Sequence, residues 1–292
     1  MPKSILVTGA NGQLGSELQQ RAPLHPELNF TFITRQELDL SASDTINAWF
    51  ADKHFEVIIN CAAYTAVDKA ETEPDLAHAI NATAVANLAT IAKAQHSSLI
   101  HVSTDYVFAG QNYRPYQETD PTDPQGLYGA SKLAGEQALL SINPAKSVII
   151  RTAWVYSQFG NNFVKTMLRL GKERAELGVI YDQVGSPTSA RDLAAAILSI
   201  IEHPKLASLT GTEIYHYSNE GVCSWYDFAK AIFSYSNLSC LVKPLETKDY
   251  PTPAKRPHYS LLNKAKIKHD FEITIPYWQD SLKTCLNSLN GK

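Results

Sequence analysis

Three side chains in the middle of the chain have the types and the spacing of an acid–base site. Tyr128 and Lys132 are four residues apart in a segment with helical periodicity, so the phenol and the ammonium share one face. A free phenol has a pKa of about 10, and an adjacent ammonium favours the phenolate, so Lys132 is expected to lower the pKa of Tyr128. Such a phenol can protonate a carbonyl oxygen as hydride arrives, and the Thr104 hydroxyl, directly after an apolar run, can hydrogen-bond the same oxygen. For the Tyr–Lys pair taken by itself, a solvated helix face is the alternative.

A glycine-rich loop near the N-terminus has the spacing of a dinucleotide-binding turn. Gly9, Gly12 and Gly15 separate an apolar run, residues 4–8, from a helical pattern, residues 13–21. The first glycine allows the tight turn, the second lets the backbone approach a pyrophosphate, and the third lets the helix pack closely on the sheet. The helix N-terminus favours the phosphate charge. An ordinary strand–turn–helix is the alternative, but this loop opens an alternating fold, which favours nucleotide binding.

The residues after the second and third apolar runs bear on which dinucleotide is bound. Arg35 follows residues 29–33 where an acidic residue would bond the ribose 2′-hydroxyl, so the sequence favours NADPH and leaves NADH open. A solvated surface arginine is the alternative. Asp39 and Leu40 are expected near the adenine. Three residues after the third run are expected to line the middle of the cofactor cleft: Ala63, Tyr64 and Thr65.

Short β-branched runs alternate with longer helical patterns in the first half of the chain. The predicted strands span residues 4–8, 29–33, 57–60, 99–103 and 147–150. The predicted helices between them span residues 13–21, 43–53, 75–94 and 128–140. The less regular second half carries helical patterns at residues 162–172, 191–201, 224–233 and 277–289 and a strand at 214–217. Fully apolar strands that alternate with helices predict α/β architecture with a doubly wound parallel sheet covered on both faces.

Composition excludes several classes of protein. The net charge is −3 over 292 residues, which argues against a nucleic-acid partner. The sequence has neither a signal-peptide pattern nor a run of about 18 apolar residues, so no membrane segment is expected. The histidines form no metal-binding pattern. The cysteines lie far apart in sequence, without zinc spacing, so we expect reduced thiols and a cytoplasmic protein: Cys61, Cys223, Cys240 and Cys285.

The chain resembles a known enzyme family over most of its length. The glycine loop, residues 60–63, residues 103–105 and the Tyr128–Lys132 pair resemble the extended short-chain dehydrogenase/reductase superfamily. Further segments, in the same order along the chain, are similar to dTDP-4-dehydrorhamnose reductases: residues 63–71, 103–108, 151–156, 161–167, 182–188 and 250–257. The resemblance implies a Rossmann-type NAD(P)-binding domain, residues 1–155 plus about 190–225. It also implies a smaller α/β substrate-binding domain, about 156–189 plus 226–292.

The resemblance also implies a reaction, the reduction of the C4 ketone of dTDP-4-dehydro-β-L-rhamnose by hydride from NAD(P)H. Tyr128 would donate the proton, Lys132 would hold the nicotinamide ribose, and Thr104 would orient the ketone. Asp105 and Trp154 would face the sugar. Three residues of the first turn would meet the pyrophosphate: Gly12, Gln13 and Leu14.

Some positions are less certain matches to the family. Arg256 is a candidate for the substrate diphosphate, because a planar cation suits that group, with a plain loop arginine as the alternative. Tyr259 stands where the family usually has Asn, which affects the contacts at the thymidine end. Some members use Mg²⁺ near an acidic residue of the first helix, where this chain has Glu17, but one carboxylate does not make a magnesium site. A solvated helix residue is the alternative for Glu17, and a homodimer remains open.

Three other functions compete with ketone reduction. A nucleotide-sugar dehydratase needs a second carboxylate after the strand-end Thr–Asp, and this chain has Tyr106 there. An epimerase uses the same Tyr–Lys pair and remains open. A non-catalytic NADP-binding regulatory subunit, like the β-subunit of methionine adenosyltransferase, is disfavoured by the intact Thr104, Tyr128 and Lys132.

Overall fold

The computed structural model describes residues 2–291 and has a six-stranded sheet at its centre. The strands are β1 (Lys3–Thr8), β2 (Leu28–Ile33), β3 (Val57–Asn60), β4 (Ser98–Thr104), β5 (Ser147–Thr152) and β10 (Thr212–His216). Their order is β10, β5, β4, β3, β1, β2, and every neighbouring pair is parallel. The prediction of a doubly wound parallel sheet is therefore confirmed. The chain passes from β1 to β2 on one side and then to β3 on the other, so a crevice opens beyond the carboxyl ends of β1 and β3.

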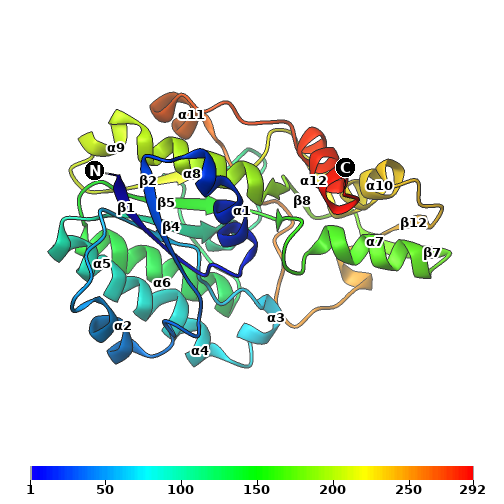
Figure 1. Ribbon diagram of the computed structural model, residues 1–292. Coiled ribbons are helices and arrows are strands. Elements are labelled where there is room, and N and C mark those ends of the chain that lie inside the picture. The colour runs from blue at the N-terminus through cyan, green and yellow to red at the C-terminus, as the bar shows by residue number, and fades with distance from the viewer. Residues whose placement is uncertain (1, 292) are drawn as a thin grey trace.

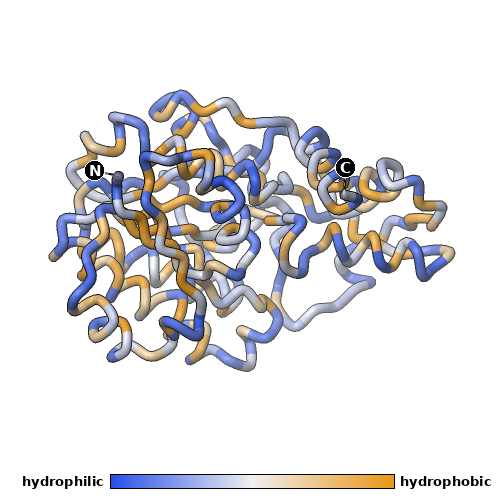
Figure 2. The backbone as a smooth tube through the Cα atoms, in the orientation of Figure 1, coloured by the Kyte–Doolittle hydropathy of each residue, from blue (hydrophilic) through white to orange (hydrophobic). Residues whose placement is uncertain are grey.

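Helices cover both faces of this sheet (Figure 1). One face carries α2 (Ser43–Phe50), α4 (Pro74–His78), α5 (Ala84–Gln95) and α6 (Leu127–Ile142). The other face carries α1 (Gln13–Arg21), α8 (Ala190–Glu202), α9 (Pro204–Ser208) and α11 (Ala265–Phe271). Because strand side chains alternate, Ile5 and Val7 pack in the core beneath α1 and α8, whereas Leu6 packs in the core beneath α2 and α5. Figure 2 shows apolar positions both in this central region and in the helices around it.

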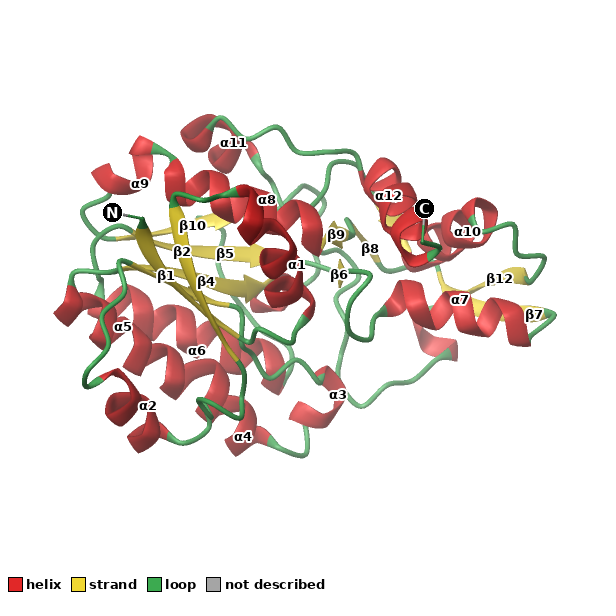
Figure 3. Ribbon diagram, in the orientation of Figure 1, coloured by secondary structure: helices red, strands yellow, loops and turns green. Residues whose placement is uncertain are grey.

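A second group of elements lies beyond the strand ends, at the right of Figure 3. It contains α7 (Phe163–Glu173), α10 (Trp225–Tyr235), α12 (Trp278–Leu289) and the parallel pair β7 (Glu176–Ile180) and β12 (Leu241–Leu245). Its core is a separate cluster that includes Phe228, Ile232 and Leu282. These separate cores support the two-domain division given above, which stays a prediction.

Short elements connect the two groups and border the crevice. Two strand pairs, β6 (Val155–Tyr156) with β9 (Thr188–Ser189) and β8 (Val184–Gly185) with β11 (Cys223–Ser224), lie between the main sheet and the second group. The remaining short helices are α3 (Val67–Ala70), η1 (Ala22–Leu24), η3 (Asp105–Val107) and η4 (Thr247–Asp249). Among residues 2–291, no helix is long and apolar enough to cross a membrane.

The predicted continuous helix at residues 75–94 is wrong in one respect. A π-helical turn, η2 (Ala79–Thr83), separates α4 from α5. Its Asn81 side chain accepts a hydrogen bond from the Tyr64 backbone N–H at 2.9 Å and donates to the Tyr64 carbonyl at 3.0 Å. The carbonyl of Asn81 also lies so close to α6 that a Cβ on Gly135 would come within 2.1 Å of it. The turn is thus shaped by contacts with distant segments, which helical periodicity does not report. Such turns often occur at functional sites.

Candidate active site

A cleft of about 1180 Å³ opens at the carboxyl ends of the central strands. It begins beside Thr34 after β2, passes the ends of β1, β3 and β4, and reaches Thr152 and Val155. Most residues predicted to meet the cofactor line it: Gly9, Gly12, Gln13, Leu14, Arg35, Asp39, Leu40, Ala63, Tyr64, Thr65, Tyr128 and Lys132. Its position is where α/β sheets of this topology bind their ligands.

The glycine loop brings bare backbone to the edge of this cleft. Gly9 has φ +68°, and a Cβ there would lie 2.8 Å from the backbone N of Ala62. A Cβ on Gly15 would lie 2.4 Å from the Gly9 carbonyl oxygen. Gly15 therefore lets α1 pack against the loop and does not itself line the cleft. Gly12 lines the cleft and directly precedes α1, so the unpaired N–H groups of the first turn of α1 face a space that suits a phosphate.

Arg35 and Asp39 stand together at the β2 end of the cleft. The Arg35 guanidinium contacts the Asp39 carboxylate at 3.2 Å, and both side chains are substantially exposed. The other Asp39 carboxylate oxygen accepts hydrogen bonds from the backbone N–H and the hydroxyl of Ser41, at 2.9 and 2.7 Å. These Ser41 hydrogen bonds lower the pKa of Asp39. Arg35 is thus a cation at the cleft wall whose exposed carboxylate partner can be exchanged for a phosphate.

Tyr128 lines the inner end of the cleft, and the Thr104 hydroxyl contacts it from behind, without lining the cleft itself. The Tyr128 ring packs edge-on against Tyr106, with 5.5 Å between the ring centroids. Burial raises the pKa of the Tyr128 phenol, and the neighbouring Thr104 hydroxyl opposes that effect. The expectation that Lys132 lowers the pKa of this phenol is wrong for the chain by itself, because burial dominates. The phenol is protonated at neutral pH, as a free phenol is, and this is the state that a proton donor requires.

Lys132 turns toward the sheet and is almost completely buried. Its Nζ donates to the Val102 carbonyl at 2.7 Å and lies 3.4 Å from Nε2 of His101. Burial lowers the pKa of Lys132 to about 8, and the nearby Glu136 carboxylate acts in the opposite direction. The helical spacing correctly placed Lys132 beside Tyr128 along the cleft wall, but the hydrogen-bond partners of its Nζ come from β4.

Asp105 and Trp154 lie on the side of Tyr128 that faces the second group of elements. Asp105 accepts a hydrogen bond from the Thr104 hydroxyl at 3.0 Å, whereas its Oδ2 has no hydrogen-bond partner among the described residues. Burial raises the pKa of Asp105 to about 7. Trp154 has φ +50° and stacks on Trp225 with 3.6 Å between ring centroids. A Cβ on Gly185 would touch both this indole and the Ser260 hydroxyl, so the wall here is tightly packed.

Arg256 reaches the site from a loop of the second group. It pairs with Asp68 at 2.7 Å and donates to the Tyr106 hydroxyl at 3.2 Å. Since Tyr106 packs on Tyr128, the guanidinium stands close to the predicted proton donor. Two side chains from the main-sheet half of the chain hold Arg256 in place, and its contact with the substrate diphosphate stays a prediction. Tyr259 donates its backbone N–H to the Gly110 carbonyl, so the departure from the family lies beside this wall.

Known proteins match the chain from end to end. A family described as the RmlD substrate binding domain matches residues 3–290. The chain belongs to this family. A dTDP-4-dehydrorhamnose reductase of Aggregatibacter actinomycetemcomitans is 43% identical over 96% of this chain and 97% of that protein. The resemblance inferred from the motifs is therefore confirmed.

Solved structures of relatives extend this match to three dimensions. A dTDP-4-dehydrorhamnose reductase of Clostridium acetobutylicum is 42% identical, with a TM-score of 0.92 over 98% of this chain and 99% of that one. A dTDP-4-dehydrorhamnose reductase of Bacillus anthracis, solved in complex with NADP, is 41% identical, with a TM-score of 0.91 over 99% of this chain and 100% of that one.

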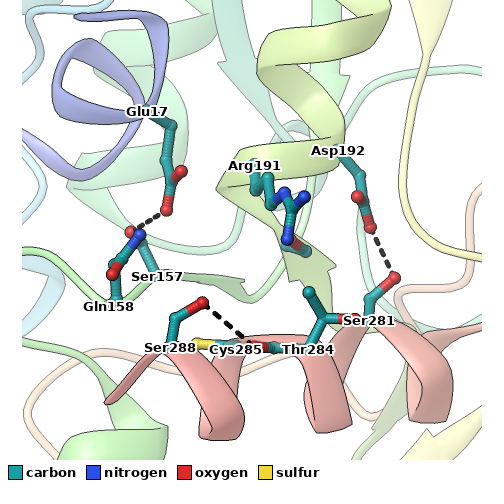
Figure 4. A pocket seen from close by; sticks show the side chains of 10 residues that line it. Glu17, Ser157, Gln158, Arg191, Asp192, Ser281, Thr284, Cys285 and Ser288 are labelled. Carbon is teal, nitrogen blue, oxygen red and sulfur yellow. Dashed lines mark hydrogen bonds between the residues drawn. The ribbon is translucent and has the colours of Figure 1, made fainter. Parts of the chain in front are cut away.

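Glu17, the position compared with the magnesium site of some members of the RmlD family, does not lie in a donor set that fits this ion. It is buried, so the alternative of a solvated residue is wrong, and its carboxylate accepts a hydrogen bond from the Ser157 hydroxyl at 2.6 Å. Figure 4 shows the Arg191 guanidinium between Glu17 and Asp192. The cavity that these residues line is only about 20 Å³. Mg²⁺ requires six oxygen ligands and usually retains several waters, so a space of this size that already contains a cationic side chain does not suit it.

Several residues of this RmlD-family site gave no signal in the sequence. Asn81 fixes the backbone of Tyr64, and Asp68 fixes Arg256 from 188 positions away. His101 touches Lys132, and its place two residues before Ser103 in a predicted strand was the available clue, since alternate residues share a face. These contacts join segments far apart in the chain, so sequence spacing does not reveal them.

Proposed function

We propose that the chain reduces the C4 ketone of dTDP-4-dehydro-β-L-rhamnose to dTDP-β-L-rhamnose with NADPH, the last step in making that nucleotide sugar. The observation that carries the proposal is that Tyr128 and Lys132 line the inner end of a cleft that starts at a glycine loop, with the Thr104 hydroxyl against Tyr128. Reductases at about two-fifths identity over nearly the whole chain, named above, support the substrate.

The cleft wall fits a dinucleotide along its whole length. Gly9 and Gly12 leave backbone without side chains where the pyrophosphate would lie, and the first turn of α1 offers N–H donors there. Arg35 would exchange its contact with Asp39 for the 2′-phosphate, which favours NADPH over NADH. Ala63, Tyr64 and Thr65 would line the middle, on a backbone held by Asn81. The relative with bound NADP supports the same choice.

The residues at the inner end would divide the chemistry among them. NADPH, when bound, supplies the hydride to the ketone carbon. Tyr128 would hold the proton that the ketone oxygen requires, because a phenol is neutral at pH 7. Lys132 lines the cleft wall beside Tyr128, with its Nζ held by β4, and would hold the nicotinamide ribose from there. The Thr104 hydroxyl, which donates to Asp105 in the structure, would turn and donate to the ketone oxygen. The protonated form of the Asp105 carboxyl allows this turn, because that carboxyl can then donate to the Thr104 oxygen.

The sugar and diphosphate would meet the second wall of the site. Trp154 would offer the sugar an indole face held rigid by Trp225. Asp105 is buried, and its contact with the sugar stays a prediction of the family resemblance. Arg256 offers a fork of donors to the diphosphate, in competition with Asp68. Residues from both halves of the chain therefore contribute to this wall, which supports the two-domain division.

Nicotinamide oxidation by the purified protein tests the proposal. The assay supplies NADPH or NADH and dTDP-4-dehydro-β-L-rhamnose made in place by the upstream enzymes. We expect rapid oxidation with NADPH and identify dTDP-rhamnose by mass and NMR. Tight NADPH binding without oxidation would refute the reductase and favour the regulatory-subunit alternative, whereas a C4-epimeric product would indicate another nucleotide-sugar reductase.

A further inference from the structure

A buried row of polar side chains crosses the sheet and ends on Lys132. Thr8, Asn60 and His101 occupy paired positions on neighbouring strands β1, β3 and β4. The Thr8 hydroxyl lies 2.7 Å from Asn60 Oδ1, and Asn60 Nδ2 lies 3.1 Å from His101 Nδ1. His101 Nε2 lies 3.4 Å from Nζ of Lys132. All four side chains are at most 2% exposed, so the row is buried, although Thr8 and Lys132 border the cleft.

Burial makes the acceptors around Lys132 decisive for its charge. An ammonium removed from water is stable only when its protons are donated to nearby acceptors. The Val102 carbonyl accepts one hydrogen bond from Nζ at 2.7 Å. His101 Nε2, at 3.4 Å, is the next available acceptor. Burial and the Lys132 charge hold the pKa of His101 well below its usual range, so the ring is neutral. A neutral ring has one bare nitrogen and one N–H, and which nitrogen faces Lys132 matters.

Two proton arrangements satisfy the row. When the Asn60 amide presents its N–H to His101 Nδ1, the ring proton sits on Nε2 and points at Nζ, which must then be a neutral amine. When the amide makes a half-turn, His101 Nδ1–H donates to the Asn60 oxygen and Nε2 accepts from a charged Lys132. Thr8 suits both arrangements, since a hydroxyl donates or accepts. The orientation of Asn60 and the charge of Lys132 are therefore coupled through His101.

We propose that the Asn60 amide takes the half-turned orientation, and that His101 is a positioning residue that accepts a hydrogen bond from the Lys132 ammonium and keeps that amine charged and fixed at the cleft wall. The role rests on the proposed function, in which Lys132 acts as a cation beside Tyr128. His101 touches neither cofactor nor substrate and acts through Lys132. The His101 imidazole thus connects Asn60, in the interior of the sheet, with Lys132 at the cleft wall.

Other ionisable groups also surround Lys132, on its own helix and on the elements packed against it. Glu136 lies one turn further along α6 and forms a buried ion pair with Arg151 of β5 at 2.7 Å. Tyr128 precedes Lys132 on α6, Asp105 lies in η3, and Cys61 follows β3, with burial raising the pKa of each of these three groups. These groups are the same in every variant below, so differences between variants report the His101 contact.

The experiment measures the pH dependence of NADPH binding by fluorescence and of kcat/KM for the ketone. In the wild type, NADPH binding should weaken at alkaline pH as Lys132 loses its proton; this fall is called the alkaline limb below. Lys132→Met should remove the alkaline limb. His101→Leu removes the acceptor. The midpoint of the alkaline limb should therefore move about one to two pH units lower, as expected for a lost hydrogen bond to a charged group. His101→Gln offers an amide oxygen in reach of Nζ and should restore most of the shift.

Asn60→Asp provides a second readout of opposite sign. A carboxylate at residue 60 would hold the proton on His101 Nδ1 and make Nε2 a better acceptor, so the limb should move to higher pH. This variant and His101→Gln decide the question if His101→Leu does not fold.

Either of two results would overturn the role of His101. The first is an alkaline limb at the wild-type pH in all His101 and Asn60 variants, with only a uniform loss of binding. The second is an alkaline limb that persists in Lys132→Met. Absence of wild-type turnover would instead refute the proposed function, while the NADPH-binding limb would still report on His101.

Discussion

Asp105 carries a carboxyl whose ionisation the folded chain opposes. It is 3% exposed and receives one hydrogen bond from Thr104, while its Oδ2 has no partner among the described residues. Burial raises its pKa from 3.8 to about 7. The folded state therefore binds the proton more tightly than the unfolded state, and the stabilisation from this protonation is complete below about pH 4 and is lost as the pH rises through about 7.

Asp105→Asn should remove this pH-dependent cost. Between about pH 5 and pH 7 the unfolded carboxyl is ionised and the folded one is protonated, so the penalty grows by about 1.4 kcal/mol per pH unit. Relative to the wild type, the variant should thus gain about 2 to 3 kcal/mol of unfolding free energy on going from about pH 5 to about pH 8. The Asn oxygen can keep the hydrogen bond from Thr104. For a chain of this length the gain corresponds to roughly 5 °C in Tm.

Denaturant and thermal unfolding of both proteins at the two pH values measure this gain. Asp120→Asn is the matched control, because hydrogen bonds from Arg114 lower the pKa of Asp120. Stability from that carboxylate is present above its unfolded pKa, so its difference from the wild type should be the same at both pH values. An Asp105→Asn difference that is equally flat would refute the reasoning, since it would mean that burial does not shift the carboxyl.

The remaining predictions concern turnover. Tyr128→Phe should lower kcat by about 10²- to 10⁴-fold, the usual contribution of a general acid, while the NADPH Kd stays within a few-fold; wild-type activity would remove Tyr128 from its role. Arg35→Asp should raise the KM for NADPH more than that for NADH, and an unchanged ratio would exclude Arg35 from the 2′-phosphate site. A chelator should leave NADPH oxidation unchanged, because Arg191 already supplies the cation beside Glu17; a loss of rate that Mg²⁺ restores would contradict this expectation.

The local patterns of the sequence predicted the framework of the cleft. The spacing of Gly9, Gly12 and Gly15 and the pair Tyr128 and Lys132 depend on one turn or one helix, so spacing alone sets their geometry. Alternation of apolar strands with helices likewise predicted the parallel sheet, because the central strands β1, β3, β4 and β5 are largely buried on both faces. The family resemblance likewise rested on local patterns, namely short segments whose order the chain preserves.

Tertiary structure decided the partners and the proton affinities. Arg256 meets Asp68 across 188 positions, and Lys132 meets a carbonyl and an imidazole of β4 rather than the phenol of its own helix. The pKa of Tyr128 is raised and not lowered, because burial is the largest influence on this phenol. Burial and long-range pairing arise only when distant segments pack, and neither a helical period nor a motif contains that information.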